Sequence, residues 1–542
     1  MFAHSERLEF STRTTETPDI AFIAMRFPLP NRARAFLVLA AVLSLNAGIV
    51  YLVLTFADQW WAFAPILSLG AASMVYYSSL ICLNALFWRR GKLYAPIEPL
   101  LMLITAYRES GAELEATLES LVAQKIDERI RRAIVVAIDG DRETAAYART
   151  LPADKVTVVP AAYEDWLGRP RGVEFRRTVR DGVDVVFVIK STNSGKRDSV
   201  VLVRTLAHGR LQKPEAGAPA DYALPVTAEL AAAWADFVPV EATRMVGADA
   251  DTVFAPECVT AMLEEMAAPG PRPVDGVVGI IRTDSSKARD VRETAWIAYQ
   301  EVGYAIGQNF QRVYQSRITE KVSCLSGACY AIYVPTMCAP KLLAEFNEPP
   351  AADAGLYESI LSFASEDRRA VCLALSSDPG VRFKQAMDPR AVAWTVPPTD
   401  LKTFLSQRRR WSLGTLANNL WLVLFGHQLL LVERLVALVT VVGWLFTPLY
   451  FAVNVIFLHT VITEFSAYLV FISIPMMFVW AAILTMPVVS SYFADWRDRL
   501  AFYPKYALYF IVGPWMSVLI QVNSILNAHS VSWGKTVLKP VA

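Results

Sequence analysis

The chain has 542 residues, of which 54% are hydrophobic and 19% are charged. A mean hydropathy of +0.33 is too high for a soluble protein of this size, while the charged fraction is too high for a bundle of membrane helices alone. We therefore expect a membrane part joined to a soluble part of ordinary composition. The net charge of +1 excludes a strong bulk attraction to nucleic acid, so no nucleic-acid partner is expected.

The cysteines and histidines argue against a zinc site and against imidazole chemistry. Among the six cysteines only Cys324 and Cys329 lie close together, and no second pair completes a zinc spacing, so we interpret all six as reduced thiols facing the cytosol. The five histidines lie outside every motif described below. Any general base should therefore be a carboxylate.

The amino-terminal region predicts a membrane hairpin. Residues 1–34 are polar and lack the pattern of a signal peptide, so we expect a cytosolic arm. The segments 35–57 and 61–88 are each long enough to cross a bilayer, which needs roughly 20 apolar residues. Arginines precede the first segment and follow the second. This charge distribution predicts a transmembrane hairpin over 35–92 with both ends in the cytosol.

Residues 93–400 have the pattern of a soluble α/β domain. Strands that alternate with helices indicate a mostly parallel sheet, and such sheets bind ligands at the carboxyl ends of their strands. The Ala/Pro-rich stretch 211–240 is interpreted as an insertion. The predicted elements are strands at 100–104, 133–138, 183–189, 243–248 and 277–281, and a helix at 112–123.

The carboxyl-terminal region is apolar again. We expect interfacial helices over 401–434, the second of them at 412–431, and a transmembrane hairpin over 435–500. Within 501–542, a further apolar run at 502–526 has Pro514 in its middle. This run either spans the bilayer or lies in the interface as a kinked helix, and we favour the interfacial alternative. The two spans predicted for the hairpin are 435–458 and 467–493.

Two aspartates follow the predicted strand 243–248. Asp249 and Asp251 stand at positions i and i+2 directly after it. At the carboxyl end of a strand, such a pair can hold the diphosphate of a nucleotide sugar through one divalent cation, because a hard cation takes oxygen ligands and needs no histidine. The alternative is a solvated loop.

Polar residues also end three other predicted strands. Tyr107 and Glu109 follow the first strand and Asp139 follows the second. Tight turns with an acidic group suit the ribose and base of a uridine, and N-capping of the next helix is the alternative. Lys196 lies in the sequence N-S-G-K-R after the third strand. A turn glycine with two cations suits a diphosphate, and the alternative is an ordinary charged turn.

Two charged stretches lie nearer the membrane. Glu366, Asp367 and Arg368 form an acidic pair beside an arginine. One carboxylate could take a proton from an acceptor hydroxyl, and a helix-start ion pair is the alternative. The stretch 406–411, Ser-Gln-Arg-Arg-Arg-Trp, could grip an anionic group and a flat one. Its alternative is a positive-inside anchor with an aromatic residue at the headgroups.

The order strand-turn, D-G, G-K-R, D-A-D, E-D-R and Q-R-R-R-W resembles that of the membrane-integrated processive family 2 glycosyltransferases. Within them the chain most resembles chitin synthases, and hyaluronan synthases come next. Gln407, Arg410 and Trp411 match the family's Q-x-x-R-W, whereas Arg408 and Arg409 lie outside that pattern and are interpreted as a membrane anchor. The resemblance covers most of the chain. It implies an α/β domain of the GT-A type, with a mostly parallel sheet, embedded between transmembrane helices.

Two further elements bear on the resemblance. Trp533, Gly534 and Thr536 match the W-G-x-T of the family's gating segment, which contacts the donor from the cytosolic side. The stretch 324–329 departs from the C-x-P-G-C-F of chitin synthases, and its Ser326 and Gly327 are closer to the S-G-P of hyaluronan synthases. This element lines the acceptor pocket in the family, so the departure concerns the identity of the acceptor and product.

The resemblance implies a processive, inverting enzyme that polymerises GlcNAc from UDP-GlcNAc into β-1,4-linked chitin and moves the polymer across the membrane. Its partners are then the donor, the growing polysaccharide and the lipid bilayer. The protein would be a multi-pass membrane protein of the plasma membrane with a cytosolic catalytic domain. The alternatives are a hyaluronan synthase that uses UDP-GlcNAc and UDP-GlcUA in turn, and a non-enzymatic transporter or receptor.

The same resemblance implies a role for each motif. Asp367 is expected to be the general base, with Glu366 and Arg368 beside it. Arg410 compensates charge on the departing diphosphate, and Trp411 stacks on the acceptor sugar. The remaining assignments are a Mg²⁺ or Mn²⁺ ion on Asp251, with Asp249 reaching the nucleotide, and the UDP part of the donor against Ala106, Tyr107, Glu109, Asp139 and Lys196.

Overall fold

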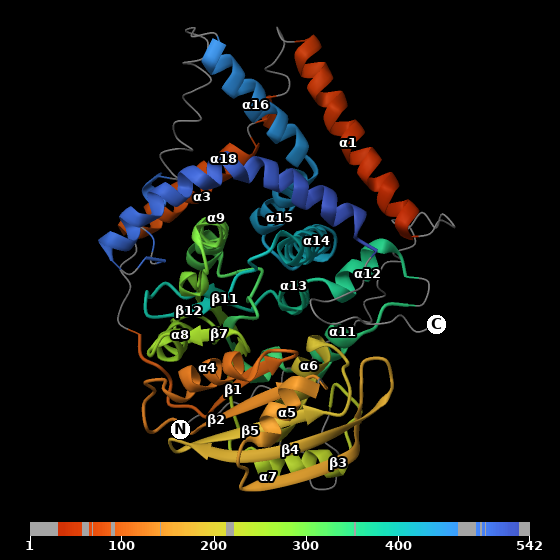
Figure 1. Ribbon diagram of the computed structural model, residues 1–542, viewed down its shortest axis with the longest axis vertical. Coiled ribbons are helices and arrows are strands. Elements are labelled where there is room, and N and C mark those ends of the chain that lie inside the picture. Colours follow the sequence, from red (N-terminus) through yellow and green to blue (C-terminus); the bar gives the residue numbers. More distant parts are fainter. Residues whose placement is uncertain are drawn as a thin grey trace.

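The computed structural model describes residues 31–56, 64–67, 69–87, 93–140, 142–212, 222–351, 354–463, 484–487, 490, 492–493 and 495–529. Figure 1 shows two regions: a sheet with packed helices in the lower half, and long helices above it. The predicted span 467–493 lies mostly outside the described residues. Trp533, Gly534 and Thr536 of the predicted gating segment also lie outside them.

A nine-stranded mixed sheet forms the centre of the lower half, in the order β11-β8-β10-β6-β1-β2-β5-β4-β3. Its four central strands, β6, β1, β2 and β5, run parallel, as predicted. Four of the predicted strands are thereby confirmed. The strands are β1 (Leu100–Ala106), β2 (Arg132–Ile138), β3 (Lys155–Glu164), β4 (Pro170–Arg180), β5 (Val183–Lys190), β6 (Arg244–Asp249), β8 (Gly276–Val278), β10 (Cys329–Tyr333) and β11 (Phe383–Gln385).

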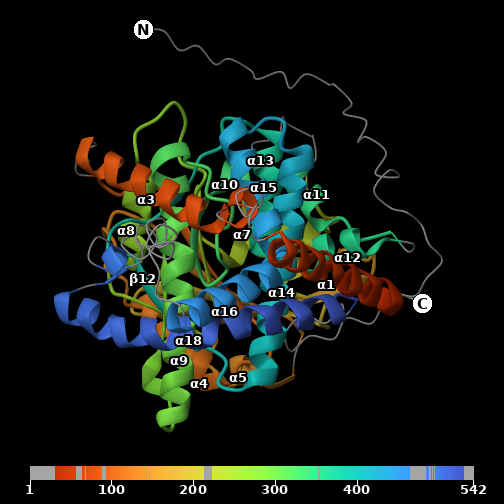
Figure 2. The same ribbon diagram turned by 90° about the horizontal axis from the view of Figure 1, so that it is seen from above.

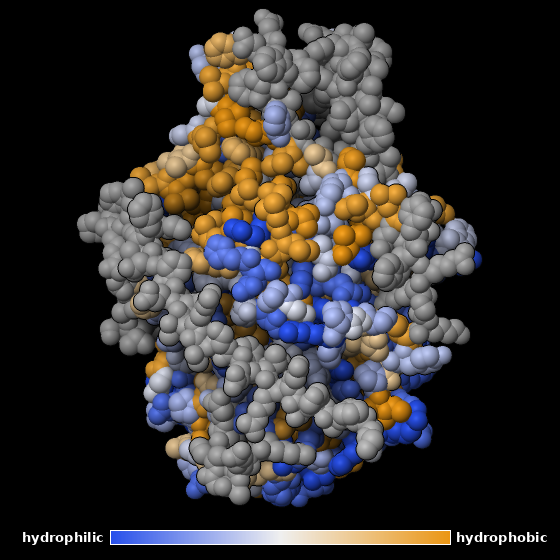
Figure 3. All heavy atoms as spheres, turned by 180° about the vertical axis from the view of Figure 1, so that it is seen from behind, coloured by the Kyte–Doolittle hydropathy of each residue, from blue (hydrophilic) through white to orange (hydrophobic). Residues whose placement is uncertain are grey.

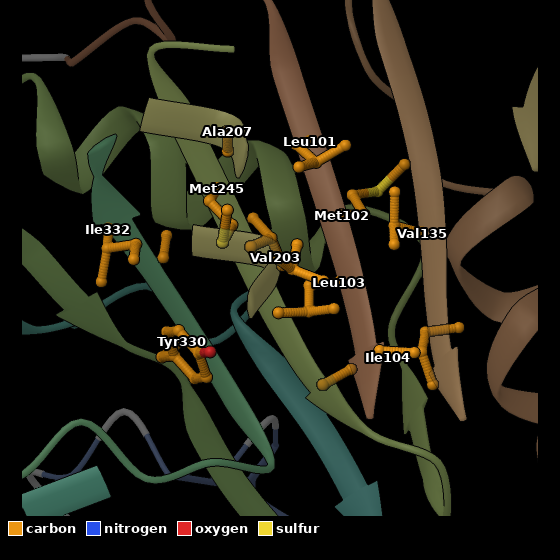
Figure 4. Packing of buried hydrophobic residues seen from close by; sticks show 14 of the residues in the cluster. Leu101, Met102, Leu103, Ile104, Val135, Val203, Ala207, Met245, Tyr330 and Ile332 are labelled. Carbon is orange, nitrogen blue, oxygen red and sulfur yellow. The ribbon is translucent and has the colours of Figure 1, made fainter. Parts of the chain in front are cut away.

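The central strands are apolar and buried along most of their length because helices cover them. Figure 4 shows side chains of β1 packed with Val135 of β2, Met245 of β6, and Val203 and Ala207 of α6. Helix α7 lies within the predicted insertion and buries Trp234 against β3 and β4, so this stretch completes the core of the sheet. The covering helices are α4 (Gly111–Val122), α5 (Arg142–Thr150), α6 (Lys196–Leu211), α7 (Ala228–Phe237) and α8 (Cys258–Met266).

The single strand predicted at 277–281 is wrong, because the chain breaks at Gly279. Before the break β8 pairs with β10; after it β9 (Ile280–Thr283) joins a second sheet with β7 (Thr252–Phe254) and β12 (Val392–Thr395). The amide of Gly279 donates to the carbonyl of Cys329, whereas the next amide donates to the carbonyl of Ala391. A Cβ at Gly279 would lie 2.4 Å from the Cys329 sulfur, so the chain can change partners here only because this residue has no side chain.

Helices of the second half connect the sheet to the long helices above. Helix α14 (Leu401–Phe425) is continuous, so the separate second helix predicted at 412–431 is wrong. It packs against α13, α15 and α18 and lies inside the molecule, not on its surface. The other connecting elements are α9 (Val291–Gly307), the π-helical η4 (Gln308–Arg312) and η5 (Gln315–Thr319), the short 3₁₀ helix η3 (Ser285–Lys287), α10 (Val334–Met337), α11 (Pro340–Asn347), α12 (Leu356–Phe363) and α13 (Glu366–Ser377).

Apolar helices form the upper half. Among the described residues, two helices are long and apolar enough to cross a membrane: Arg32–Thr55 in α1 (Asn31–Thr55) and the whole of α18 (Trp496–Leu526). The bent pair α15 (Leu431–Leu445) and α16 (Thr447–Thr463) makes a third if it counts as one span. Figure 3 shows the apolar residues gathered in the upper part and the polar residues below. Large apolar side chains of α1, such as Phe36 and Leu54, are exposed there.

The structure differs from the predicted hairpins in two ways. The span 435–458 is bent by 65° between α15 and α16, because Pro448 has no amide hydrogen to continue the first helix. Helix α3 (Leu69–Phe87), with the short α2 (Ala64–Leu67), crosses the direction of α1 steeply and does not return beside it (Figures 1 and 2). Its Tyr77 ring packs 5.1 Å from the Tyr314 ring of the π-helical region, which ties α3 to the lower half.

Helix α18 runs across the top of the sheet domain, beneath α1 and α16 (Figures 1 and 2). It contacts α9 and α14 and bends in its middle part, where Pro514 removes a backbone hydrogen bond. Its length and composition satisfy the criteria for a span. Its crosswise course is the one that the interfacial alternative requires.

Candidate active site

A cavity of about 250 Å³ lies at the edge of the sheet where the parallel strands end. Strands β1, β2, β5 and β6 share a direction, so the residues that follow them meet at one edge. The antiparallel β10 begins at this same edge, and the starts of α6 and α13 and the middle of α14 complete the wall. Of the predicted site residues, the lining includes Ala106, Tyr107, Glu109, Asp139, Lys196, Asp249, Asp251, Ser326, Gly327, Glu366, Asp367, Gln407, Arg410 and Trp411.

The turn after β1 is held by its own side chains. The amide of Tyr107 donates to the carboxylate of Glu109, and the hydroxyl of Thr144 donates to the Glu109 carbonyl at 3.1 Å. Arg108 adopts a left-handed conformation with φ 61° and lies over the Tyr107 ring at 5.1 Å. The turn is therefore a rigid wall, with Glu109 fixed beside the cavity.

Asp139 is buried and holds the neighbouring turn. Its carboxylate accepts from the amides of Ser194 at 3.0 Å and Gly195 at 2.8 Å, and forms an ion pair with Lys190 at 2.5 Å. The next residue, Gly140, has φ +62°, and a Cβ there would lie 2.1 Å from the backbone carbon of Thr192. The D-G pair thus packs against the turn that carries Lys196, a role that the sequence alone did not indicate.

The acidic residues of two motifs meet at Lys196. Its ammonium forms an ion pair with Asp249 and lies 3.3 Å from a carboxylate oxygen of Glu366. Burial alone would lower the pKa of Lys196, but these carboxylates raise it, so the lysine stays charged. The G-K-R, D-A-D and E-D-R motifs, far apart in sequence, therefore form one charged cluster.

Asp251 is a carboxylate of this edge whose charged form is disfavoured by its surroundings. Burial, followed by the charge of Asp249, raises the pKa of Asp251 to about 6. Among the described residues, no group of three or more histidine, cysteine or acidic side chains could hold a metal by itself. A site of one or two carboxylates fits a hard cation whose remaining ligands are phosphate oxygens and water.

Glu366 and Asp367 have different environments although they are adjacent. Burial would raise the pKa of Glu366, but the charge of Lys196 lowers it below its usual range. Burial and the charge of Glu366 raise the pKa of Asp367. The Asp367 carboxylate accepts from the amide of Gly327 at 3.3 Å, which places it beside the S-G element. A pair of carboxylates with separated pKa values suits one anchor and one base.

Arg368 does not line the cavity. Its guanidinium donates to the hydroxyl of Ser323 at 3.2 Å, while its amide donates to Asp367 at 2.9 Å. The structure thus gives this arginine a supporting position between α13 and the loop that carries Ser326. The charge of Arg368 partly opposes the rise in the pKa of Asp367.

The Q-x-x-R-W face of α14 forms the side of the cavity nearest to the upper helices. Gln407, Arg410 and Trp411 all line it. The side-chain oxygen of Gln407 is buried and accepts no hydrogen bond from the described residues. Trp411 is 37% exposed and meets the ring of Tyr304 edge-on at 5.6 Å. This face offers a polar acceptor, a cation and an indole to the same space.

The interpretation of Arg408 and Arg409 as a membrane anchor is wrong. The guanidinium of Arg408 lies over the rings of Trp411 at 4.3 Å, Phe404 at 5.0 Å and Tyr304 at 5.4 Å. Arg409 is buried and donates to the carbonyl of Asn527 at 3.3 Å. Both side chains therefore pack within the protein, because α14 lies between other helices.

Sequence reasoning missed several residues that line the cavity. Tyr304 of α9 is the most important, because it contacts both Trp411 and Arg408. It lies in a helix without a motif, so only the tertiary structure brings it here. The others are Thr105, Ser199, Ala250, Ile281, Ala328, Ser365, Thr395 and Val396.

We expect the activity of the protein to fall on the acid side at a higher pH than an ordinary aspartate would give, which has a pKa of about 3.9. A base works only when deprotonated, and burial together with Glu366 raises the pKa of Asp367. The check is a pH–rate profile at saturating divalent cation. Glu366→Gln removes the second cause and should move the acid limb to lower pH, without reaching the value of an ordinary aspartate because burial remains. An acid limb that stays at the same pH in Glu366→Gln would contradict the assignment of Asp367 as the base.

A basic turn, two acidic motifs at the carboxyl edge of a parallel sheet and an indole beside them are the features expected of a hexosyltransferase, here with attached membrane helices. A sequence model of the chitin synthase family matches residues 178–539, and the chain belongs to the chitin synthase family. The predicted fold class and family are thereby confirmed. The non-enzymatic alternative is wrong. The chain is a glycosyltransferase, and it is a membrane protein.

The curated relatives agree with this membership. Chitin synthase 8 of Gibberella zeae is 29% identical over 533 residues, which cover 93% of this chain and 78% of the relative. Chitin synthase 8 of Verticillium dahliae is 25% identical, and the match covers 77% of this chain and 73% of the relative. Among solved structures, the mannosyltransferase PcManGT from Pyrobaculum calidifontis, in complex with GDP-Man and Mn²⁺, matches with 11% identity and a TM-score of 0.44, covering 87% of this chain and 99% of that chain.

Proposed function

We propose that the protein is a processive, inverting glycosyltransferase that makes chitin from UDP-GlcNAc. The observation that supports this most is that Asp367, Lys196 and Trp411 face one cavity. A base, a cation for a diphosphate and a flat surface for a sugar then stand within reach of one reacting centre. These are the groups that sugar transfer to a hydroxyl needs.

In this proposal the UDP part of the donor lies against the ends of β1 and β2, with Tyr107, Glu109 and Asp139 facing uridine. The carboxylate of Asp367 accepts the proton of the acceptor hydroxyl. The oxygen of the acceptor hydroxyl forms a bond to the anomeric carbon as the bond from this carbon to the diphosphate breaks. UDP therefore leaves with the electron pair, and the configuration at the anomeric carbon inverts. Lys196 and Arg410 lie along the cavity wall where the charge of the diphosphate develops.

A divalent cation, Mg²⁺ or Mn²⁺, fits the two neighbouring carboxylates Asp251 and Asp249. When bound, it would neutralise part of the charge of the leaving diphosphate. The pairing of Asp249 with Lys196 leaves Asp251 as the better ligand. We assign Asp251 to the cation and Asp249 to both the cation and the nucleotide.

We expect chelation of divalent cations to lower the rate by on the order of 100-fold or more, since the diphosphate would leave without a counter-charge. Adding Mn²⁺ or Mg²⁺ back should restore it. Asp251→Asn should weaken UDP binding in the presence of the cation but not in its absence, as isothermal titration calorimetry can measure. Full activity in chelator, or equal UDP affinity with and without the cation, would contradict the site.

Trp411 supports processive addition. An indole face holds a sugar ring by stacking without fixing it through many hydrogen bonds, so the product can advance by one unit. The indole lies on the side of the cavity towards the upper helices, which we propose to carry the polymer across the membrane. The protein is then a multi-pass protein of the plasma membrane with this cavity in the cytosol.

The test of this function uses the detergent-purified full chain. It is given UDP-GlcNAc alone, and then UDP-GlcNAc with UDP-GlcUA, while UDP release and polymer are measured. A chitinase-sensitive polymer from UDP-GlcNAc alone is the expected result. Polymer that forms only with both donors and is degraded by hyaluronidase would overturn the choice of product.

The hyaluronan alternative rests on one observation. The amide of Gly327 in the S-G element donates to Asp367, so the element that departs from the chitin-synthase pattern contacts the proposed base directly. A change of acceptor sugar would act through this contact. The two-donor experiment separates the alternatives.

A further inference from the structure

Two helices that are separate in sequence share the proposed chemistry. Helix α13 begins with Glu366 and Asp367, while Gln407 and Arg410 lie in the first half of α14. The reaction depends on the distance between the base on one helix and the arginine on the other, because misplacement by about an ångström can cost a large part of the rate. The contact that sets this distance is therefore functional.

Ser365, directly before α13, has an unusual conformation. Its φ of 53° and ψ of 65° lie in the left-handed region, which is uncommon for serine. A serine in this position usually accepts a hydrogen bond from an amide of the helix that follows. Here it makes no such bond, and its hydroxyl donates to the carbonyl of Arg410 at 3.2 Å. The residue before the acidic pair is thus hydrogen-bonded to the backbone of α14.

Gly414 completes this contact one helical turn after Arg410. A Cβ at Gly414 would lie 2.2 Å from the hydroxyl oxygen of Ser365 and 2.5 Å from its Cβ. Glycine weakens the interior of a helix, so its presence in the middle of α14 needs a reason. The close approach of Ser365 supplies that reason. The left-handed conformation of Ser365 and the glycine at position 414 inside a helix are each unfavourable locally. The close contact between the two residues explains both.

We propose that Ser365 and Gly414 are a pair of positioning residues that set α14 against the start of α13. The pair fixes Arg410 and Gln407 opposite Asp367 across the cavity. Ser365 lies two residues before Asp367, and Gly414 lies four residues after Arg410, so a shift at the contact passes directly to both. The inference rests on the proposed function, because it gives the separation of these groups a chemical meaning.

The experiment exchanges the two residues. Gly414→Ser should lower kcat at least tenfold, because its side chain meets Ser365 and moves α14. The double variant Ser365→Gly/Gly414→Ser should recover kcat to within about threefold of the wild type, because glycine adopts a left-handed conformation freely and leaves room for the new side chain. Affinity for UDP should fall much less than kcat, since most of the proposed donor residues belong to the ends of β1, β2 and β6 and to the start of α6, and only Arg410 moves with α14.

The matched control is Gly443→Ser in α15, where a Cβ meets no atom within 4 Å. This variant should keep the kcat of the wild type. Wild-type kcat in Gly414→Ser, a double variant no faster than Gly414→Ser, or a loss of UDP affinity in step with kcat would each overturn the pair as a positioning device.

A failure of the proposed function has a different signature. In that case the wild type itself releases no UDP from UDP-GlcNAc. The wild type and its three variants are then assayed with the nucleotide sugar that the wild type does use as the substrate. The same pattern of loss and recovery of kcat is expected. Recovery in the double variant supports the pair whichever sugar is transferred, and its absence overturns the pair.

Discussion

Asp367→Asn should abolish sugar transfer while UDP binding persists. The expected loss in kcat is on the order of 100- to 10,000-fold, the usual contribution of a general base. Asparagine keeps the size of the side chain and can still accept from the amide of Gly327, but it cannot take the proton of the acceptor hydroxyl. The donor residues at β1 and β2 are untouched, so the affinity for UDP should hold.

The measurements are the rate of UDP release and the equilibrium binding of UDP to the purified variant. Arg368→Gln is a suitable comparison, because Arg368 contacts Ser323 and lies outside the cavity lining, so its loss in kcat should be much smaller. Near-normal turnover in Asp367→Asn with tight UDP binding would remove Asp367 from the role of the base.

Lys190→Met should cause the largest loss of stability of any single change at this edge of the sheet. The Lys190 side chain is almost fully buried between Asp139 at 2.5 Å and Asp198 at 2.7 Å, and Tyr163 also donates to Asp198 at 2.7 Å. Although burial lowers the pKa of Lys190, the two aspartates raise it, so the lysine is charged. Removing one partner of a buried ion pair costs about 3–5 kcal/mol, because the remaining charge is left without a partner.

The measurement is the thermal midpoint of the purified protein, with Lys155→Met as the control. Lys155 also pairs with an aspartate, Asp236, but the two side chains are about half exposed, at 40% and 57%, and such pairs contribute about 0–1 kcal/mol. Lys190→Met should also weaken UDP binding, since Asp139 would no longer hold the turn of Ser194. Equal midpoints for the two variants would show that the buried cluster is not a major source of stability.

Local sequence patterns were sufficient for the four parallel strands at the centre of the sheet and for α4. The strands β1, β2, β5 and β6 are mostly apolar runs, because a parallel strand is buried on both faces. Helix α4 carries both its apolar face and its capping box, in which Ser110 and Glu113 bond to each other's amides. The strand at 277–281 failed because its break depends on Cys329, about fifty residues further along the chain.

The membrane part was less predictable. Apolar length alone does not distinguish a straight span from a bent pair, and the 65° bend between α15 and α16 follows from one proline. It also does not reveal that α3 packs through Tyr77 on the π-helical region, or that α18 crosses over the domain. Orientation depends on the neighbours of each helix, which hydropathy does not report.

By itself, the sequence determined the family to which the chain belongs and many of the residues that meet in the cavity. Tyr107, Asp139 and Asp249 lie at the ends of parallel strands that meet at one edge, so adjacency to a strand end was enough for them, whereas Asp367 and Trp411 were predicted from their motifs. Only the tertiary structure decided how they act on one another. The bridge of Lys196 to Asp249 and Glu366, the contact of Arg408 with Tyr304 and the contact of Ser365 with Gly414 join residues 49 to 170 positions apart, and pairings at such separations depend on packing that no local pattern encodes.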